Sequence, residues 1–508
     1  MENSRRTASI HILDDDSLIH VFCLYRPFFL GEDEDDIYRL YGGKRGWVRG
    51  RWWYGLAHVC QRWRNVILGS ASYLGVSLVC TVGTPVADML AHSPPLPLVI
   101  DYHRYRDITE DEGAILALKH RDRVRHVRLC TPVTSLQKLI AAMDEEYPFL
   151  EYLIIAPPPE DRSTVLILPE TLQAPHLRHL TLIGFPLPIG SRLLTTAVGL
   201  VTLYLRMNDP STYFHPNVLL HWLSFMPQLE TLVMDFFFAV PNREVERQLT
   251  PTPIITLPNL CLLRFGGVSA YLEALVHRII TPRLEKLKIV FFNQLIFSVP
   301  HLAQFMNTTE NLRFNIAKFW FSDEHVHMQV YPPGGAKMKP AFIINVTCQH
   351  LDWQVSSVAQ ILNSLGHLFS VVEHLIFEHD EHSRSSEEHN EVDRTEWCKL
   401  LRSFRNVKTL WIGNGLVEQL TRCLELEDGE LPLELLPELQ ELTYFGTGGA
   451  FNSFIETRQN ADRPITLVRR RPTRATPDSI HIASERSERS KPSSITRVNS
   501  EAGNDFDS

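Results

Sequence analysis

A motif of the form Pro-x-Leu-x-x-Leu-x-apolar recurs along the chain and constrains its fold more than any other feature. Six copies carry the proline, and four looser copies lack it. The six begin at Pro148, Pro175, Pro227, Pro258, Pro282 and Pro437, and the four at Val124, Leu200, Val372 and Val407. The leading apolar residues of neighbouring copies stand 23 to 35 residues apart, except for a long gap between Leu284 and Val372. Such spacing is typical of a leucine-rich repeat.

The end of each copy, Leu-x-apolar, has the period of a β-strand, which turns the two apolar side chains inward and the residue between them outward. Stacked repeats bury one continuous core and form one parallel sheet. Residues 215–225 and 269–280 are apolar at helical spacing and would pack behind that sheet. We therefore predict an α/β fold in which residues 124–459 form an irregular leucine-rich-repeat solenoid. The alternative is that the motif marks buried strands of an ordinary α/β domain.

The side chains expected to point outward from the sheet are the candidates for binding a partner. Aromatic and arginine side chains are the types most often found as energetic anchors at interfaces. The candidate partner-binding residues are Tyr204, Arg264, Lys286, Lys288 and Trp411.

Two amphipathic segments precede the repeats. Residues 10–22 place apolar side chains on one helical face behind the acidic run Asp14 to Asp16, which favours a helix N-terminus. Residues 52–70 show apolar spacings of three and four and end at Gly69. The segment between them, residues 27–51, is acidic and then rich in Gly and Arg, as in an exposed loop. We predict a helical module over 10–70, joined to the repeats by a strand and helix region over 71–123.

The sequences ILDDDSL (12–18) and LAHVCQRWRNVI (56–67) resemble the two halves of an F-box, and residues 69–100 resemble the region that follows it in a fungal group of such proteins. The resemblance implies that the helices dock on a Skp-type adaptor, and through it on a cullin scaffold, while the repeats choose the substrate of a ubiquitin ligase. It assigns adaptor binding to eight residues. They are Leu13, Leu18, Ile19, Phe22, Leu56, Val59, Cys60 and Trp63.

Three other interpretations stay open. The same apolar residues would also suit the core of a helical hairpin packed on the solenoid end. A second interpretation is a leucine-rich-repeat scaffold that binds partner proteins without a ligase role. A third possibility is a hydrolase with an unfamiliar site, although no GxSxG, HExxH, Walker or GxGxxG motif occurs. We expect that this chain is not an enzyme and that it binds no cofactor.

Composition narrows the class of protein. The chain has 508 residues, 44% of them hydrophobic, which is enough to fold. A net charge of −9 gives no general attraction to nucleic acid. No signal peptide or membrane-length apolar run is evident. Eight scattered cysteines without a CxxC pair indicate a reducing compartment, and hence the cytoplasm or the nucleus.

Polar stretches complete the expected organisation. Residues 1–9 should be a flexible terminus, residues 378–396 an exposed insertion, and residues 460–508 a disordered tail rich in Ser, Arg and Pro. The insertion contains EHDEH (378–382) and His389, which are metal-ligand types, but a hydrophilic loop explains them better. The tail contains Arg469 to Arg471 and Arg474, a short basic cluster that would suit nuclear import or an anionic partner.

Overall fold

The computed structural model describes most of the chain between Leu13 and Arg470. The described ranges are 13–26, 51–103, 112–158, 165–237, 253–292, 294–309, 311–334, 339–379, 392–425, 434–445 and 450–470. The predicted flexible terminus 1–9 lies outside them, as do most of the predicted loop 27–51, the insertion 378–396 and the tail beyond Arg470. Among the helices that are described, none has the length and apolar character needed to cross a bilayer.

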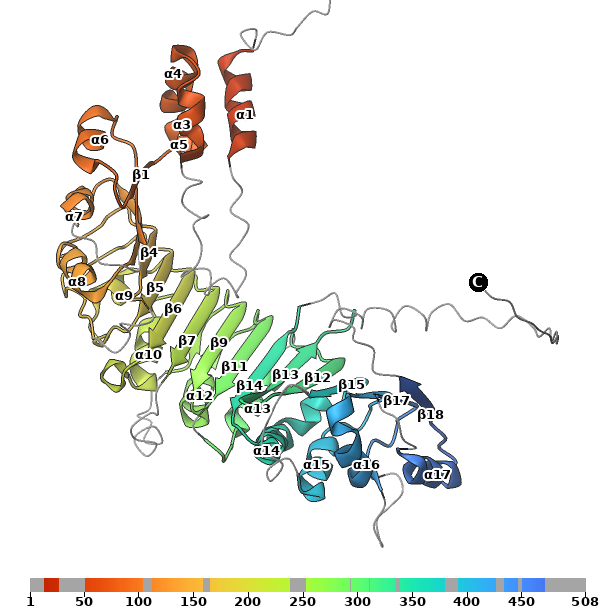
Figure 1. The fold of residues 1–508 in the computed structure, drawn as a ribbon. Coiled ribbons are helices and arrows are strands. Elements are labelled where there is room, and N and C mark those ends of the chain that lie inside the picture. The colour runs from red at the N-terminus through yellow and green to blue at the C-terminus, as the bar shows by residue number, and fades with distance from the viewer. Residues whose placement is uncertain are drawn as a thin grey trace, which may run out of the picture.

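Within the described residues, sixteen strands form one curved sheet (Figure 1). The strands follow chain order except near the middle, where β14, β13 and β12 are reversed. In spatial order they are β1 (Leu78–Thr81), β2 (Leu98–His103), β3 (Val124–Cys130), β4 (Tyr152–Ile155), β5 (His179–Ile183), β6 (Thr202–Met207), β7 (Thr231–Phe236), β9 (Leu262–Gly267), β11 (Lys286–Phe291), β14 (Phe342–Thr347), β13 (His325–Tyr331), β12 (Ile316–Phe321), β15 (His374–His379), β16 (Thr409–Ile412), β17 (Glu441–Phe445) and β18 (Thr466–Arg470).

Helices cover the outer face of this sheet, and we call the opposite side the open face (Figure 1). The helices after the N-terminal module are α6 (Val86–His92), α7 (Glu112–Leu118), α8 (Val133–Ala141), α9 (Arg192–Thr196), α10 (Pro216–Leu223), α12 (Ser269–Val276), α13 (Pro300–Asn307), α14 (Leu351–Phe369), α15 (Arg394–Leu401), α16 (Val417–Leu424) and α17 (Asn452–Asn460). Helix α10 confirms the helical segment expected over 215–225, and α12 confirms the first part of the segment expected over 269–280, whose last two residues form β10. Short 3-10 helices span η5 (Pro210–Thr212) and η7 (Asn414–Leu416), and β8 (Ile255–Thr256) pairs with β10 (Ile279–Ile280) apart from the main sheet.

The repeat motif has a clear structural basis. Each proline is the second residue of a tight turn, and the leucine two positions later donates its backbone N–H to the residue before the proline. Leu177 donates to Ala174 O at 3.1 Å and Leu229 to Met226 O at 3.2 Å. Proline suits this position because its ring fixes the required φ. The following leucines, such as Leu180 and Leu182, are at most 1% exposed, as the alternating pattern predicts.

The long gap between Leu284 and Val372 holds three strands that break the parallel order. Strand β13 is antiparallel to both β12 and β14, while β14 pairs in parallel with β11 and β12 with β15. All three alternate buried and more exposed residues. The sheet is therefore mixed at this point, whereas a wholly parallel sheet was predicted.

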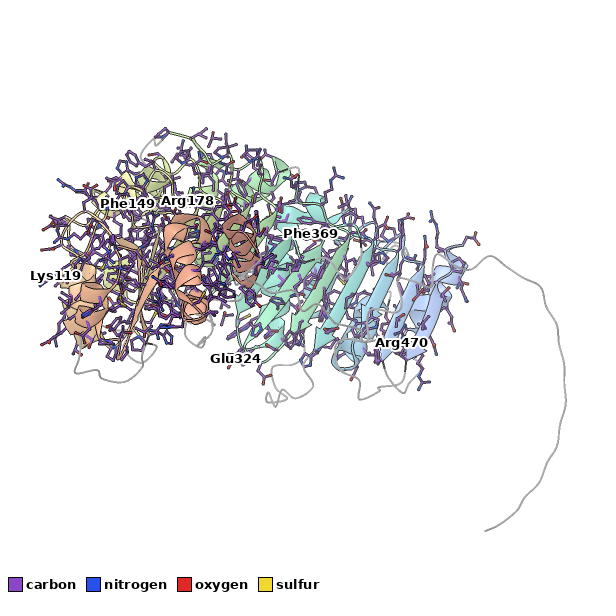
Figure 2. All side chains as sticks on the ribbon, turned by 90° about the horizontal axis from the view of Figure 1, so that it is seen from above. Lys119, Phe149, Arg178, Glu324, Phe369 and Arg470 are labelled. Atoms are coloured by element: carbon purple, nitrogen blue, oxygen red, sulfur yellow. The ribbon has the colours of Figure 1, made fainter. Side chains whose placement is uncertain are left out.

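The predicted range of the solenoid, 124–459, is too short at both ends. Strands β1 and β2 pair in parallel with each other and β2 with β3, so the region 71–123 belongs to the sheet and residue 124 is no boundary. At the other end β18 pairs with β17, so residues 466–470 are ordered and the predicted tail begins too early. Leu467 packs against the core. The sequence did not predict this because the surrounding segment is rich in arginine. Lys119 and Arg470 lie near opposite ends of this array (Figure 2).

Four helices of the N-terminal module lie in its described residues, 13–26 and 51–74. They are α1 (Asp15–Tyr25), α3 (Trp52–Ala57), α4 (Gln61–Gly69) and α5 (Ala71–Leu74). The segment 52–70 is thus two helices, because the chain turns extended at Cys60, which caps α4. The module joins the sheet through Trp53, whose indole N–H donates to Ser77 O at 3.1 Å, and Arg51, which donates to Val79 O at 3.3 Å.

Candidate protein-interaction surfaces

The helical module is held together by α1 packing on α4. Leu18 and Phe22 are fully buried, and the Phe22 ring meets the Trp63 ring edge-on with centroids 5.0 Å apart. Asp14 caps α1 by accepting a hydrogen bond from Ser17 N at 2.7 Å, and hydrogen bonding to Ser17 lowers the pKa of that carboxyl. The acidic run thus serves as a helix cap, in agreement with the sequence pattern.

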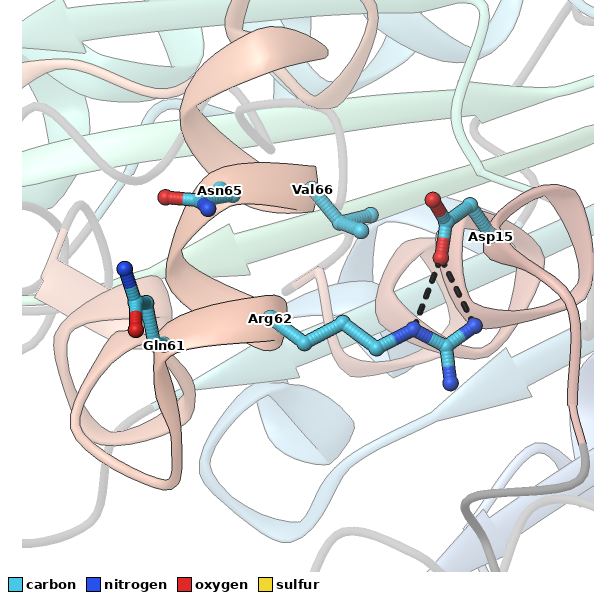
Figure 3. A pocket seen from close by; sticks show the side chains of 5 residues that line it. All are labelled: Asp15, Gln61, Arg62, Asn65 and Val66. Atoms are coloured by element: carbon cyan, nitrogen blue, oxygen red, sulfur yellow. Dashed lines mark hydrogen bonds and ion pairs between the residues drawn. The ribbon is translucent and has the colours of Figure 1, made fainter.

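An ion pair links the two halves of the module at its surface. Arg62 donates from Nε and Nη2 to Asp15 Oδ1 at 2.9 and 2.7 Å, and from Nη2 to the carbonyl oxygen of Leu13 at 2.6 Å. A shallow pocket lies beside the pair (Figure 3). It is lined by Asp15, Gln61, Arg62, Asn65 and Val66. The arginine therefore fixes the start of α1 on α4, although 47 residues separate Asp15 from it in the sequence.

The structure divides the eight predicted adaptor-binding residues into three groups. Leu18 and Phe22 lie inside the module, so they cannot themselves form a docking surface and can only support one. Four are partly buried against the core, namely Ile19, Leu56, Cys60 and Trp63. Val59 and Leu13 are exposed, by 59% and 36%.

Three exposed apolar residues of the module were missed, namely Leu24, Tyr25 and Tyr73, of which Tyr73 is 61% exposed and lies on α5. Leu24 is 79% exposed and Tyr25 is 66% exposed, and both belong to the last turn of α1. The predicted helix ended at Phe22, three residues before the end of α1.

The open face of the solenoid carries a polar cluster on β6, β7 and β9. The Tyr204 hydroxyl donates to Asp235 Oδ2 at 3.2 Å, and Arg264 Nη2 lies 3.1 Å from the same oxygen. Asp235 is only 2% exposed. Burial raises the pKa of the Tyr204 phenol, and the Asp235 carboxylate raises it further. The cluster is thus a satisfied, largely buried network.

These contacts alter the predicted role of Tyr204. It lies on the open face as expected, but at 4% exposure it is part of a small apolar cluster and is no exposed anchor. That cluster comprises Cys130, Ile154, Ala156, Ile183, Tyr204 and Val233. Large neighbours on adjacent strands bury residues that alternation alone would leave accessible.

The other four predicted partner-binding residues are accessible in part. Arg264, Lys286, Lys288 and Trp411 are all intermediate in exposure. The Trp411 ring packs edge-on against Phe445, with centroids 5.1 Å apart. These residues are not brought to one point, because Trp411 lies on β16 and the lysines on β11. If the open face binds a partner, it does so along an extended surface.

A row of rings lies on the N-terminal half of the open face. His126, Tyr152 and His179 occupy neighbouring register positions on β3, β4 and β5, with centroids 5.9 and 5.4 Å apart. Burial lowers the pKa of His126 to about 4, although the nearby Glu151 carboxylate acts in the opposite direction. His126 is therefore neutral at pH 7.

Metal binding has no support in the part of the chain that is described, where no three His, Cys, Asp or Glu side chains are grouped to hold an ion. Of the EHDEH sequence, Glu378 and His379 lie on β15, and Glu378 pairs with Lys318 at 2.8 Å. The remaining residues of that sequence and His389 lie outside the described ranges.

Comparison with known proteins gives little further identification. No protein family matches the chain, and no curated protein matches it. The crystal structure of the TLR13–ssRNA13 complex aligns with 78% of this chain and 49% of that chain, at 15% sequence identity and a TM-score of 0.30. The chain therefore spans about half the length of that protein. The solenoid assignment rests on the strand order and register given above.

Proposed function

We propose that this protein is a substrate-recognition adaptor of an SCF-type ubiquitin ligase, in which the helical module docks on a Skp-type adaptor and the open face binds a protein substrate. The observation that carries the proposal is the set of exposed apolar residues on the module, Leu13, Leu24, Tyr25, Val59 and Tyr73. These residues are exposed, whereas Leu18 and Phe22 hold the same helices together.

Docking by such a surface has a simple physical basis. A helix that presents apolar anchors at its surface can bind in an apolar groove of a partner. Burial of one exposed leucine or valine contributes roughly 1.5–3 kcal/mol before entropic costs. A single substitution at Leu24 or Val59 should therefore weaken docking by a measurable amount.

The role requires no chemistry from this chain. An adaptor that holds a substrate beside a separate enzyme accelerates the reaction by raising effective concentration. The Skp-type adaptor and a cullin would supply the link to that enzyme. The Asp15–Arg62 pair helps to hold α1 on α4.

The test is a pull-down of the full chain with a purified Skp-type adaptor. We expect the wild type to bind, and Leu24→Asp and Val59→Asp each to weaken binding at least tenfold, because each places a charge in an apolar interface. Ile167→Asp is the matched control, since Ile167 is 74% exposed and lies in the repeat region. It should bind like the wild type.

The outcome also separates the proposal from a repeat scaffold that acts without a ligase. If the wild type fails to bind the Skp-type adaptor, or if both aspartate variants bind as well as Ile167→Asp, the ligase role is lost. A scaffold role through the open face would then be the remaining function.

A further inference from the structure

Two cysteine thiols meet where α15 packs on α16, on the outer side of the sheet (Figure 1). Cys398 lies in the middle of α15, and Cys423 lies in the last turn of α16. Their Sγ atoms are 3.6 Å apart, although 25 residues separate them in the sequence. The Cys398 Sγ also lies 4.0 Å from the carbonyl oxygen of Cys423. Two thiols this close share one covalent reaction, the formation of a disulfide.

The contact between the two helices is well defined around the pair. Arg394, in the first turn of α15, donates from Nε to Arg422 O at 3.3 Å and from Nη2 to Glu425 O at 2.7 Å. The indole N–H of Trp397 donates to Gln419 Oε1 at 3.2 Å. These hydrogen bonds join the start of α15 to the end of α16, so the packing of the helices fixes the approach of the two sulfur atoms.

The gap between the sulfur atoms is small enough for a bond. A disulfide bond is about 2.05 Å long, so the two Sγ atoms need to approach by about 1.5 Å. A change of side-chain rotamer at one cysteine moves its sulfur atom by more than this. The bond therefore requires no separation of α15 from α16.

Burial restricts which oxidants can react. Cys398 is 4% exposed and Cys423 is fully buried. Reaction therefore needs a small oxidant and a local opening of the structure. Opening costs least in the last turn of a helix, where backbone carbonyls have no partner within the helix. Cys423 is the residue before Leu424, which ends α16, so this thiol is the first that a small oxidant reaches.

We propose that Cys398 and Cys423 form a reversible disulfide in the presence of a peroxide. The Cys423 thiolate attacks one peroxide oxygen, so that an S–O bond forms, the O–O bond breaks and the leaving hydroxide takes a proton to become water. The Cys398 thiolate then attacks the Cys423 sulfur, so that the S–S bond forms, the S–O bond breaks and a second water leaves. Both sulfurs are oxidised, and their two electrons reduce the peroxide. A dithiol reductant reverses the reaction by exchange.

The cross-link encloses β16, the strand that carries Trp411, in one covalent loop. A disulfide restricts the opened or unfolded chain more than the folded one, so this repeat should open less often when oxidised. Disulfides inside cells are usually transient and redox-sensing. The inference is independent of docking on a Skp-type adaptor.

The test treats the full chain with excess hydrogen peroxide, alkylates the remaining thiols after denaturation, and identifies peptides by mass spectrometry without reduction. We expect a peptide in which residue 398 is joined to residue 423, and its loss after treatment with dithiothreitol. Cys261→Ser is the matched control, because the Cys261 thiol is partly exposed and donates to Asn259 O at 3.3 Å. This variant should form the cross-link as the wild type does.

Hydrogen exchange measures the consequence for the fold. The amides of α16 should exchange at least about tenfold more slowly in the oxidised wild type than in the reduced form, and Cys398→Ala should show no such change. Oxidation to sulfinic acids without the joined peptide would overturn the proposal, as would a peroxide-treated chain with both thiols still open to alkylation. Because the joined peptide is sought in the wild type, this result does not depend on the folding of any variant.

Discussion

Asp235 and Arg264 form an ion pair across β7 and β9, with 3.1 Å between Oδ2 and Nη2, on the face of the sheet that carries no helices. The side chain of Asp235 is 3% exposed and that of Arg264 is 20% exposed. The pair joins two neighbouring strands in the middle of the open face.

Removal of the Asp235 carboxylate should destabilise the folded protein. Asp235→Ala leaves the Arg264 guanidinium and the Tyr204 hydroxyl without their partner, and we expect a loss of about 2–3 kcal/mol in the free energy of unfolding. Urea denaturation measures this loss. Glu434→Ala is the control, because its ion pair with Arg402 is about half exposed and should contribute less than about 1 kcal/mol. Equal losses in the two variants would contradict the role given to Asp235.

Gly266 leaves space for the same carboxylate. A Cβ atom at this position would lie 2.7 Å from Asp235 Oδ1. Gly266→Ala should therefore displace Asp235 and destabilise the protein by about 1–3 kcal/mol. Gly199→Ala is the comparison, since nothing lies within 4 Å of its Cβ position. A melting temperature of Gly266→Ala equal to that of Gly199→Ala would show that the space is not needed.

Glu273 links two successive helices of the solenoid. Its carboxylate oxygens on α12 accept from His301 N and Leu302 N of α13, both at 2.8 Å, and so cap a helix whose own cap residue, Val299, has no suitable side chain. Glu273→Ala should cost about 1–2 kcal/mol. Glu273→Gln retains one acceptor and should lose less. An alanine variant as stable as the glutamine variant would argue against this cap.

His126 should make stability depend on pH. Its pKa in the folded protein is lowered to about 4, whereas the unfolded chain has the ordinary value of about 6.5. Between these two values the unfolded chain binds the proton and the folded protein does not. The free energy of unfolding is therefore highest above pH 6.5 and falls by about 1–3 kcal/mol as pH falls toward 4. His126→Gln should reduce the loss measured by urea denaturation at pH 7 and pH 4.5. An unchanged loss in that variant would exclude this histidine as the source.

Much of the solenoid could be predicted because its repeat has a direct physical meaning. The proline fixes a turn, and the alternating apolar residues that follow, such as Leu232 and Met234, enter the core. Strands β12 to β14 were not predicted because the proline-led repeat motif does not precede them. Their spatial order in the sheet is also the reverse of their order in the chain. Strand β18 escaped because a short alternation at Leu467 lies among arginines.

The binding surfaces were harder to predict than the fold. Alternation correctly placed Tyr204 on the open face, but its burial depends on neighbours contributed by other strands. The same applies to Leu18 and Phe22, whose helical spacing suits a core as well as a docking surface. Leu24 and Tyr25 show the converse, because their exposure becomes evident only when the position of α4 beside α1 is known.

The central claim is that the helical module docks this chain on a Skp-type adaptor. The most direct test is the molar mass, by light scattering, of the species formed when the full chain is mixed with a purified Skp-type adaptor. We predict a single complex with one copy of each protein, lost in Val59→Asp and retained in Ile167→Asp. Two separate species with the wild-type chain would contradict the account.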